Sequence, residues 1–411
     1  MEPAACNSQG INDVLDAGTS IVIENDVNLI GSANNRDPSK YFYDGGDSLQ
    51  ASFPISVSRA AFPYKNGSPN SLEAGAVEVA DTDKWGECFV APVGRDLYES
   101  KSSPDPDPTS AFQETDIYLM ASQNNTAVTV PSPASSQIIN VTLSFLNGTS
   151  STKKITMTSS MSDRMFSVDV GQTIRISNVY TGDEICANNP VQANLITGDR
   201  NSNFEMRWYS LLPKDQFSSD YFTPVTKRSG ANGAASVYLF NPDPSNSITV
   251  IETLSNGNTR SHTVPAGSSL LVKLNDDDDK NSGHRFKTND DKPFFGMVLV
   301  DTSGGGEIVD WGVPLQPTDS LTAKAIIGLG YACTGGPRLG PDPTEITCHT
   351  SGGDKSSTLQ PSPVSGSYDE SNYLFAMPSY LHSIITTDQL TVDPSALAFS
   401  LLSILRFGYQ Q

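Results

Sequence analysis

The stretch DKWGECFVAPV, residues 83–93, has a second copy in DQFSSDYFTPV, residues 215–225. Both fit the pattern D-x-[W/F]-x-x-x-[F/Y]-x-x-P-V without a gap, and a degraded third copy begins at Asp319 in DSLTAKAIIG. The apolar positions recur while the polar positions between them change. We therefore interpret the motif as scaffold, a core anchor followed by an edge or exit strand. On this interpretation, Trp85→Ala costs roughly 3 to 5 kcal/mol of stability.

A second repeated element supports a tandem organisation. IYLMASQNNTAVTV, residues 117–130, aligns without a gap with VYLFNPDPSNSITV, residues 237–250. Two apolar runs separated by a polar segment rich in Asn, Pro and Ser predict a β-hairpin in each copy.

Two shorter elements recur in the same order. The pattern G-x-x-[I/L]-x-[I/V] predicts a half-buried strand leaving a turn. A proline eight or ten residues after another glycine predicts the entry to a strand, where no ladder donor is needed. The glycines of the first pattern are Gly18, Gly171 and Gly267, and the prolines of the second are Pro54, Pro190 and Pro293.

These repeats predict an all-β protein of tandem antiparallel units, each of roughly 100 residues and sandwich-like, with blades as the alternative. The units span 1–100, 116–228 and 229–335, with a Pro/Asp-rich linker at 101–115 and a low-complexity or poorly ordered tail at 336–411. The first unit lacks the opening hairpin, and no secretory signal is visible. We expect from this that the chain begins inside a unit.

Composition agrees with this fold class and restricts the partners. Among 411 residues, 32 Gly and 27 Pro favour short strands and many turns. A net charge of -20 repels a phosphate backbone, so nucleic acid is not an expected partner. The most apolar stretch, residues 396–405, is about half the length of a membrane span. We expect no membrane-spanning segment.

Cysteines and glycosylation sequons permit an extracellular location. The five cysteines stand far apart, without a C-x-x-C pair, and the nearest two, Cys333 and Cys348, are the best candidates for a disulfide. Possible N-glycosylation sequons occur at Asn66, Asn124, Asn140 and Asn147.

Several quoted runs resemble a known family. YFYDGGDSLQASFPISVSRAAFP, LEAGAVEVADTDKWGECFVAPVG, EICANNPVQANLITGD, MRWYSLLPKDQFSSDYFTPV and DWGVPLQPTDSLTAKAIIGLGYAC are similar to the N-terminal domain of immunoglobulin-G Fc-binding proteins. The resemblance covers Gly18 to Cys333. It implies an extracellular, β-rich repeat region of an adhesive, mucus-like or surface protein, and does not extend to antibody binding.

The candidate sites follow from residue types. Arg200, Arg207, Trp208 and Tyr209 are of the kinds that dominate interface hot spots, on an expected loop between strands. The alternative is that Trp208 and Leu211 belong to the core of the second unit.

The acidic run NDDDDKNSG contains Asp276, Asp277, Asp278 and Asp279. It is interpreted as a solvated hairpin tip, with a calcium site as the alternative. No catalytic motif and no cofactor motif is found. We therefore expect a non-enzymatic extracellular adhesion, matrix or surface protein that binds protein or glycan partners. The alternative is a carbohydrate-active enzyme or calcium-dependent lectin using the acidic loops.

Overall fold

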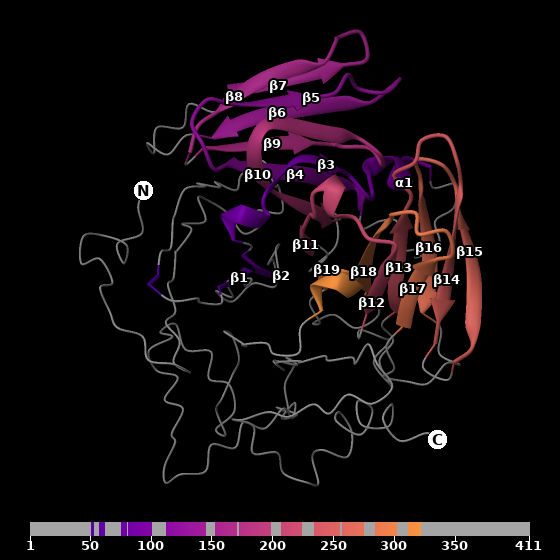
Figure 1. Cartoon of the computed structure of the whole chain (residues 1–411). Helices are drawn as coiled ribbons and strands as arrows, with labels where there is room; N and C mark the ends of the chain where they lie inside the picture. Colours follow the sequence, from indigo (N-terminus) through magenta and orange to yellow (C-terminus); the bar gives the residue numbers. More distant parts are fainter. Residues whose placement is uncertain are drawn as a thin grey trace, which may run out of the picture.

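The structure is a computed structural model. It describes residues 51–52, 57–61, 75–79, 81–100, 112–144, 153–170, 172–198, 207–223, 234–254, 257–274, 284–301 and 311–321. These residues form antiparallel strands, together with one short α-helix, α1 (Arg95–Glu99), and three 3-10 turns (Figure 1). The expected all-β class is confirmed.

The first sandwich is built around one long strand, β10 (Glu184–Gly198). Its ladder is irregular between Cys186 and Val191, and the two halves of the strand have different partners. The first half pairs with β3 (Gly86–Val90) and β5 (Thr126–Val130), and β5 pairs with β8 (Arg164–Val168). The second half pairs with β4 (Glu114–Ala121) and β11 (Arg207–Ser210). Beyond β4 follow β9 (Thr173–Ser177), β6 (Ile138–Ser144) and β7 (Lys153–Thr158).

The second sandwich repeats this strand order with β10 divided into two strands. One sheet contains β12 (Asp220–Thr223), β17 (His284–Thr288), β14 (Ile248–Thr253) and β15 (Thr259–Val264), with β20 (Gln316–Pro317) on the outer edge of β12. The other contains β19 (Trp311–Pro314), β18 (Phe295–Asp301), β13 (Ala234–Phe240) and β16 (Ser269–Leu274). In the described residues, the β6 and β7 pair is an addition of the first sandwich that the second does not have.

The two predicted hairpins are wrong. β4 and β5, from residues 117–130, do not pair with each other, and neither do β13 and β14, from residues 237–250. In the first copy both strands pair with β10, β4 with its second half and β5 with its first half, and in the second copy the two strands belong to different sheets. The physical reason is burial: Leu119 of β4 and Val128 of β5 both belong to the core of the first sandwich, so both strands turn apolar side chains toward it.

The other repeat elements agree with the structure in part. Strands begin at Thr173 and Ser269, as the patterns after Gly171 and Gly267 predict. Pro293 lies just before β18, but Pro190 lies inside β10, next to the irregularity in its pairing. A proline is tolerated there because a ladder that is already interrupted needs no donor.

The opening motif has the same local structure in each of its three copies. Each copy contains a 3-10 turn, and the extended residue after the turn donates a hydrogen bond from its N–H to the first carbonyl of the turn. The three turns are η2 (Thr82–Lys84), η4 (Lys214–Gln216) and η5 (Thr318–Ser320). The extended residue is Trp85, Phe217 or Leu321. Trp85 and Phe217 are half-buried, and Leu321 is exposed. The core anchor of the motif is therefore at a different position from the predicted one. The fully buried residues of the motif are Phe89 and Tyr221, in the strands that follow the turns.

One strand pairing crosses a predicted unit boundary. The segment that the sequence placed in unit 1–100 contributes β3, which pairs with β10 of the next unit. The expected linker 101–115 overlaps the start of β4. Before these elements lies a two-stranded sheet of β1 (Ser58–Ala61) and β2 (Gly75–Glu78). The predicted tail, 336–411, lies outside the described residues.

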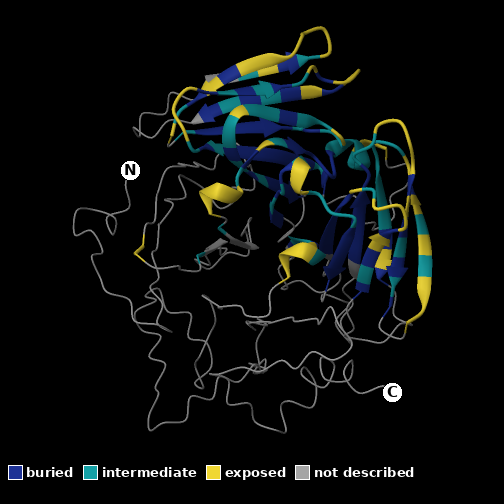
Figure 2. Cartoon of the chain, viewed as in Figure 1, coloured by how far each residue is buried: buried dark blue, intermediate teal, exposed yellow. Residues whose placement is uncertain are grey.

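The two sandwiches pack against each other through a sheet that is buried on both faces (Figure 2). Val237 and Leu239 of β13 point into the core of the second sandwich, whereas Tyr238 and Phe240 join the core of the first. Phe112 meets Tyr238 edge to face, with ring centroids 5.1 Å apart. This double burial explains the uninterrupted apolar run in β13.

Candidate functional site

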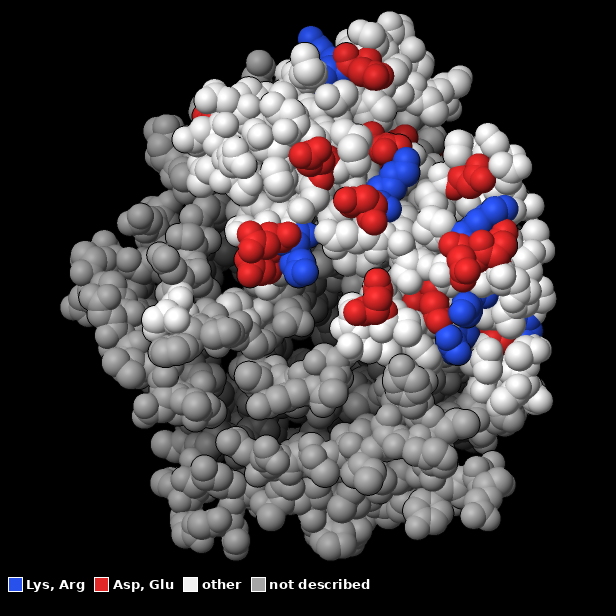
Figure 3. All heavy atoms as spheres, in the orientation of Figure 1, with Lys and Arg blue, Asp and Glu red and all other residues white. Residues whose placement is uncertain are grey.

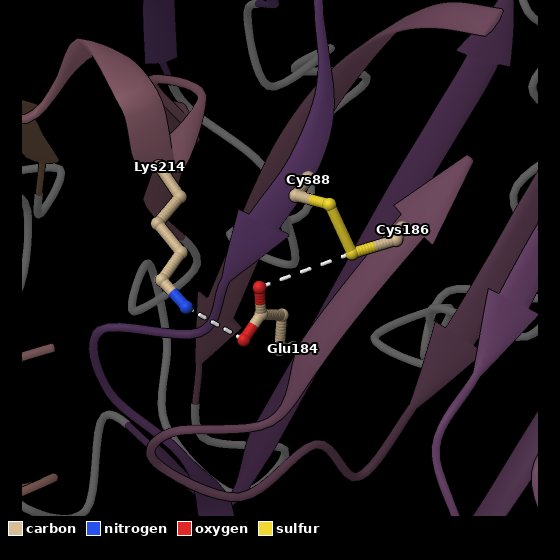
Figure 4. The surroundings of a disulfide bond; sticks show 4 residues. All are labelled: Cys88, Glu184, Cys186 and Lys214. Carbon is tan, nitrogen blue, oxygen red and sulfur yellow. Dashed lines mark hydrogen bonds and ion pairs between the residues drawn. A yellow bond between two sulfur atoms is a disulfide. The ribbon is translucent and has the colours of Figure 1, made fainter. Parts of the chain in front are cut away.

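The candidate site surrounds a disulfide bond between Cys88 of β3 and Cys186 of β10, on the first sandwich (Figure 4). The two residues lie directly opposite each other in the antiparallel ladder, with Cα atoms 4.1 Å apart. Thr129 of β5 lies opposite Cys186, and Met165 of β8 lies opposite Thr129. These four residues therefore form one row across four strands, on the sheet face that points away from the core.

A carboxylate and an ammonium group complete the surroundings. Glu184, two residues before Cys186 on the same strand, places its Oε1 atom 3.9 Å from the Cys186 sulfur. Its Oε2 atom accepts a hydrogen bond from Nζ of Lys214, at 2.7 Å, and both side chains are 39% exposed. Figure 4 shows the carboxylate between the sulfur and the ammonium group, pointing toward both.

The sequence did not indicate this pair. The disulfide closes a loop of 98 residues, and the two cysteines belong to different repeat elements, so neither spacing nor motif joins them. The predicted pair, Cys333 and Cys348, lies outside the described residues. Cys88 and Cys186 come together because β10 pairs with the strand of the opening motif. The bond is consistent with an oxidising compartment.

Cys88, Cys186 and Glu184 are also the one group in the described part of the chain that could hold a metal ion by proximity. Each offers a ligand atom, and these atoms all lie within 4.8 Å of one another. The chemistry available here is therefore thiol–disulfide exchange and, after reduction, cation binding by two thiolates and a carboxylate.

A second polar cluster lies inside the second sandwich. Glu252 of β14 has a fully buried carboxylate, which hydrogen-bonds Nε2 of His262 at 2.8 Å and Nδ1 of His284 at 2.7 Å. Burial raises the pKa of Glu252, but the two histidine hydrogen bonds and charges outweigh it and lower the pKa to about 2. Glu252 therefore stays ionised and binds three strands together.

The structure corrects the prediction of an exposed binding loop at residues 207–209. Arg207, Trp208 and Tyr209 belong to β11 and are 1%, 2% and 1% exposed. They are interior side chains and not the exposed hot spot that residue type suggested. Trp208 and Leu211 are both buried, and Leu211 belongs to the core of the first sandwich, as the alternative expects. Arg200 lies outside the described residues.

The remaining sequence candidates fall in two groups. Asn124 is exposed in the turn after β4, and Asn140 is half-buried in β6, where its Oδ1 atom accepts a hydrogen bond from Thr156. Asn66, Asn147 and the acidic run Asp276, Asp277, Asp278 and Asp279 lie outside the described residues.

No family model matches the chain. No curated protein matches it. Within the described residues, no helix is long and apolar enough to cross a lipid bilayer.

Proposed function

We propose that this chain is a non-enzymatic extracellular adhesion, matrix or surface protein whose β-sandwich repeats bind protein or glycan partners. The observation that carries the proposal is the repetition of one strand order in two consecutive sandwiches, joined through a buried apolar sheet face. Phe217 and Phe295, with ring centroids 5.2 Å apart, contribute to this contact. Firmly packed β-sandwich modules are a common architecture of cell-surface proteins, because they hold loops at fixed separations.

The disulfide supports an extracellular location. Cross-links that close long loops persist in oxidising compartments and are reduced in most cytosols. The resemblance of the repeats to the N-terminal domain family of immunoglobulin-G Fc-binding proteins supports the same location. We do not extend the proposal to antibody binding.

The three 3-10 turns supply a repeated surface feature for partner binding. Each carries an exposed aspartate in its first turn, Asp83, Asp215 or Asp319. Figure 3 shows acidic side chains in several separate clusters on this face, some with Lys or Arg beside them. A partner with spaced basic groups, or a glycan bridged by cations, would fit such a surface.

Binding of the purified full chain to arrays of glycans and of secreted proteins tests the proposal. We expect specific binding, reduced at least about tenfold when Asp83, Asp215 and Asp319 are all changed to Asn. The matched control changes three other exposed acidic residues, Glu87, Asp290 and Asp291, to the corresponding amides.

Two outcomes would overturn the proposal. Turnover of any polysaccharide by the purified chain would favour the carbohydrate-active enzyme. Antibody staining confined to the cytosol of the source cells, with none on intact cells or in the medium, would exclude an extracellular role.

A further inference from the structure

The disulfide site holds a set of ligand atoms that its oxidised state leaves unused. Two sulfurs and a carboxylate oxygen lie within 4.8 Å of one another, on two adjacent strands of one sheet. In the oxidised chain the sulfurs are bonded to each other, and Glu184 takes its counter-charge from Lys214. Breaking the S–S bond would place two thiols beside this carboxylate.

The fold keeps these groups together after reduction. β3 and β10 are held by their backbone ladder and by Phe89 and Ile185, which lie opposite each other on the core side and are each 1% exposed. The cysteine Cα atoms, 4.1 Å apart in the oxidised chain, therefore stay close through the backbone ladder and this packing when the disulfide is reduced.

The spacing suits a tetrahedral ion. With Zn–S bonds of about 2.3 Å, two thiolates on one tetrahedral zinc ion have sulfurs about 3.8 Å apart. Opposed cysteines can reach this separation by rotating their side chains. A carboxylate bound to the same ion has its oxygen about 3.5 Å from each sulfur. Oε1 of Glu184 already lies 3.9 Å from Sγ of Cys186.

Charge and exposure favour a thiophilic divalent cation. Two thiolates and one carboxylate give three negative charges, of which the ammonium group of Lys214 offsets one, and soft thiolate ligands select zinc over calcium or magnesium. Both cysteines are half-buried and the Glu184 side chain is 39% exposed, so water can occupy the fourth position.

We propose that Cys88, Cys186 and Glu184 form a zinc-binding site when the disulfide between the two cysteines is reduced. The proposal is independent of the proposed adhesive function. Reduction by two molecules of a small thiol transfers two electrons to the S–S bond and gives two cysteine thiols, while the reductant becomes a disulfide. Zn²⁺ then binds both sulfurs as their two protons leave to solvent.

Zinc binding is measured on the full chain, reduced with a phosphine that is then removed under nitrogen. Cys6, Cys333 and Cys348 are changed to Ser, so that only the two site cysteines remain. We expect one zinc ion per reduced chain and none per oxidised chain. Cobalt in place of zinc is expected to give a thiolate-to-metal charge-transfer band.

Two carboxylate variants locate the site. Glu184→Gln is expected to weaken zinc binding at least about tenfold, whereas Glu87→Gln, on the same strand as Cys88 and exposed, leaves it unchanged. Both variants keep the disulfide when oxidised, and the β-sheet circular dichroism of each reduced chain shows that it remains folded. Absence of zinc from the folded, reduced chain would overturn the proposal. So would equal affinities in Glu184→Gln and Glu87→Gln.

Discussion

Gly86 lies so close to Pro213 that a Cβ on residue 86 would fall 2.3 Å from the Cβ of the proline. Gly86 begins β3, directly after the first 3-10 turn, and Pro213 is the N-cap of the second. Nearby, the Gln216 side chain donates a hydrogen bond to the carbonyl of Lys84 at 3.1 Å. The first and second copies of the motif therefore touch, where one sandwich passes into the next.

Gly86→Ala is expected to destabilise the protein, because the added methyl group must displace Pro213 or β3. Overpacking of this kind costs about 1 to 3 kcal/mol. Urea unfolding followed by tryptophan fluorescence measures the loss. Ser261→Ala, at an exposed position on β15, is the control with little expected effect. If the urea midpoint of Gly86→Ala equals that of the control, Pro213 and β3 accommodate the added methyl group without loss of stability.

Trp208→Ala is expected to cost about 3 to 5 kcal/mol, because the indole is a large side chain that is only 2% exposed. Trp85→Ala is expected to cost less, about 1 to 2 kcal/mol, because Trp85 is half-buried. This ranking revises the larger value that the sequence motif predicted for Trp85. Urea unfolding of both variants decides it, and a greater loss in Trp85→Ala would restore the core-anchor interpretation.

Removing the disulfide by the paired change Cys88→Ser and Cys186→Ser is expected to destabilise the chain by about 3 to 5 kcal/mol. The bond closes a loop of 98 residues, and cross-links of this span restrict the unfolded chain most. Unfolding of the variant is compared with that of the oxidised wild type. Reduction of the wild type in the absence of metal should lower its stability to that of the variant. A wild type unaffected by reduction would argue against this bond as a stabilising link.

The free energy of unfolding is expected to fall on acidification, over a pH range that is set by the pKa of Glu252. Its pKa is near 4.5 in the unfolded chain and about 2 in the folded one, so the contribution is complete above pH 4.5 and is lost as the pH falls toward 2. Glu252→Gln should flatten the pH dependence of the unfolding free energy in this window, whereas Glu87→Gln should not. An unchanged slope in Glu252→Gln would assign the acid sensitivity to other groups.

Much of the fold could be predicted from local pattern. A strand follows the opening motif in its first two copies, as predicted, because alternating apolar residues act over a few residues. The same holds for the strands that begin at Thr173 and Ser269. These features need no knowledge of distant parts of the chain.

Strand partners could not be predicted in the same way. The runs at 117–130 and 237–250 have the form of a hairpin, yet the two strands of each run do not pair with each other. An alternating strand shows which side chains face a core but not which strand lies beside it. Residue types likewise predicted an exposed loop rich in binding residues at β11, although this segment is a strand whose Arg207, Trp208 and Tyr209 side chains are buried.

The sequence by itself determined the all-β class and the strands that begin at Thr173 and Ser269, since these depend on propensity and short-range pattern. Only the tertiary structure decided that β3 belongs with the strands that follow it, and that Cys88, Cys186 and Glu184 meet. The disulfide joins residues 98 positions apart, and it forms because β10 pairs with β3 along its first half and with β4 along its second.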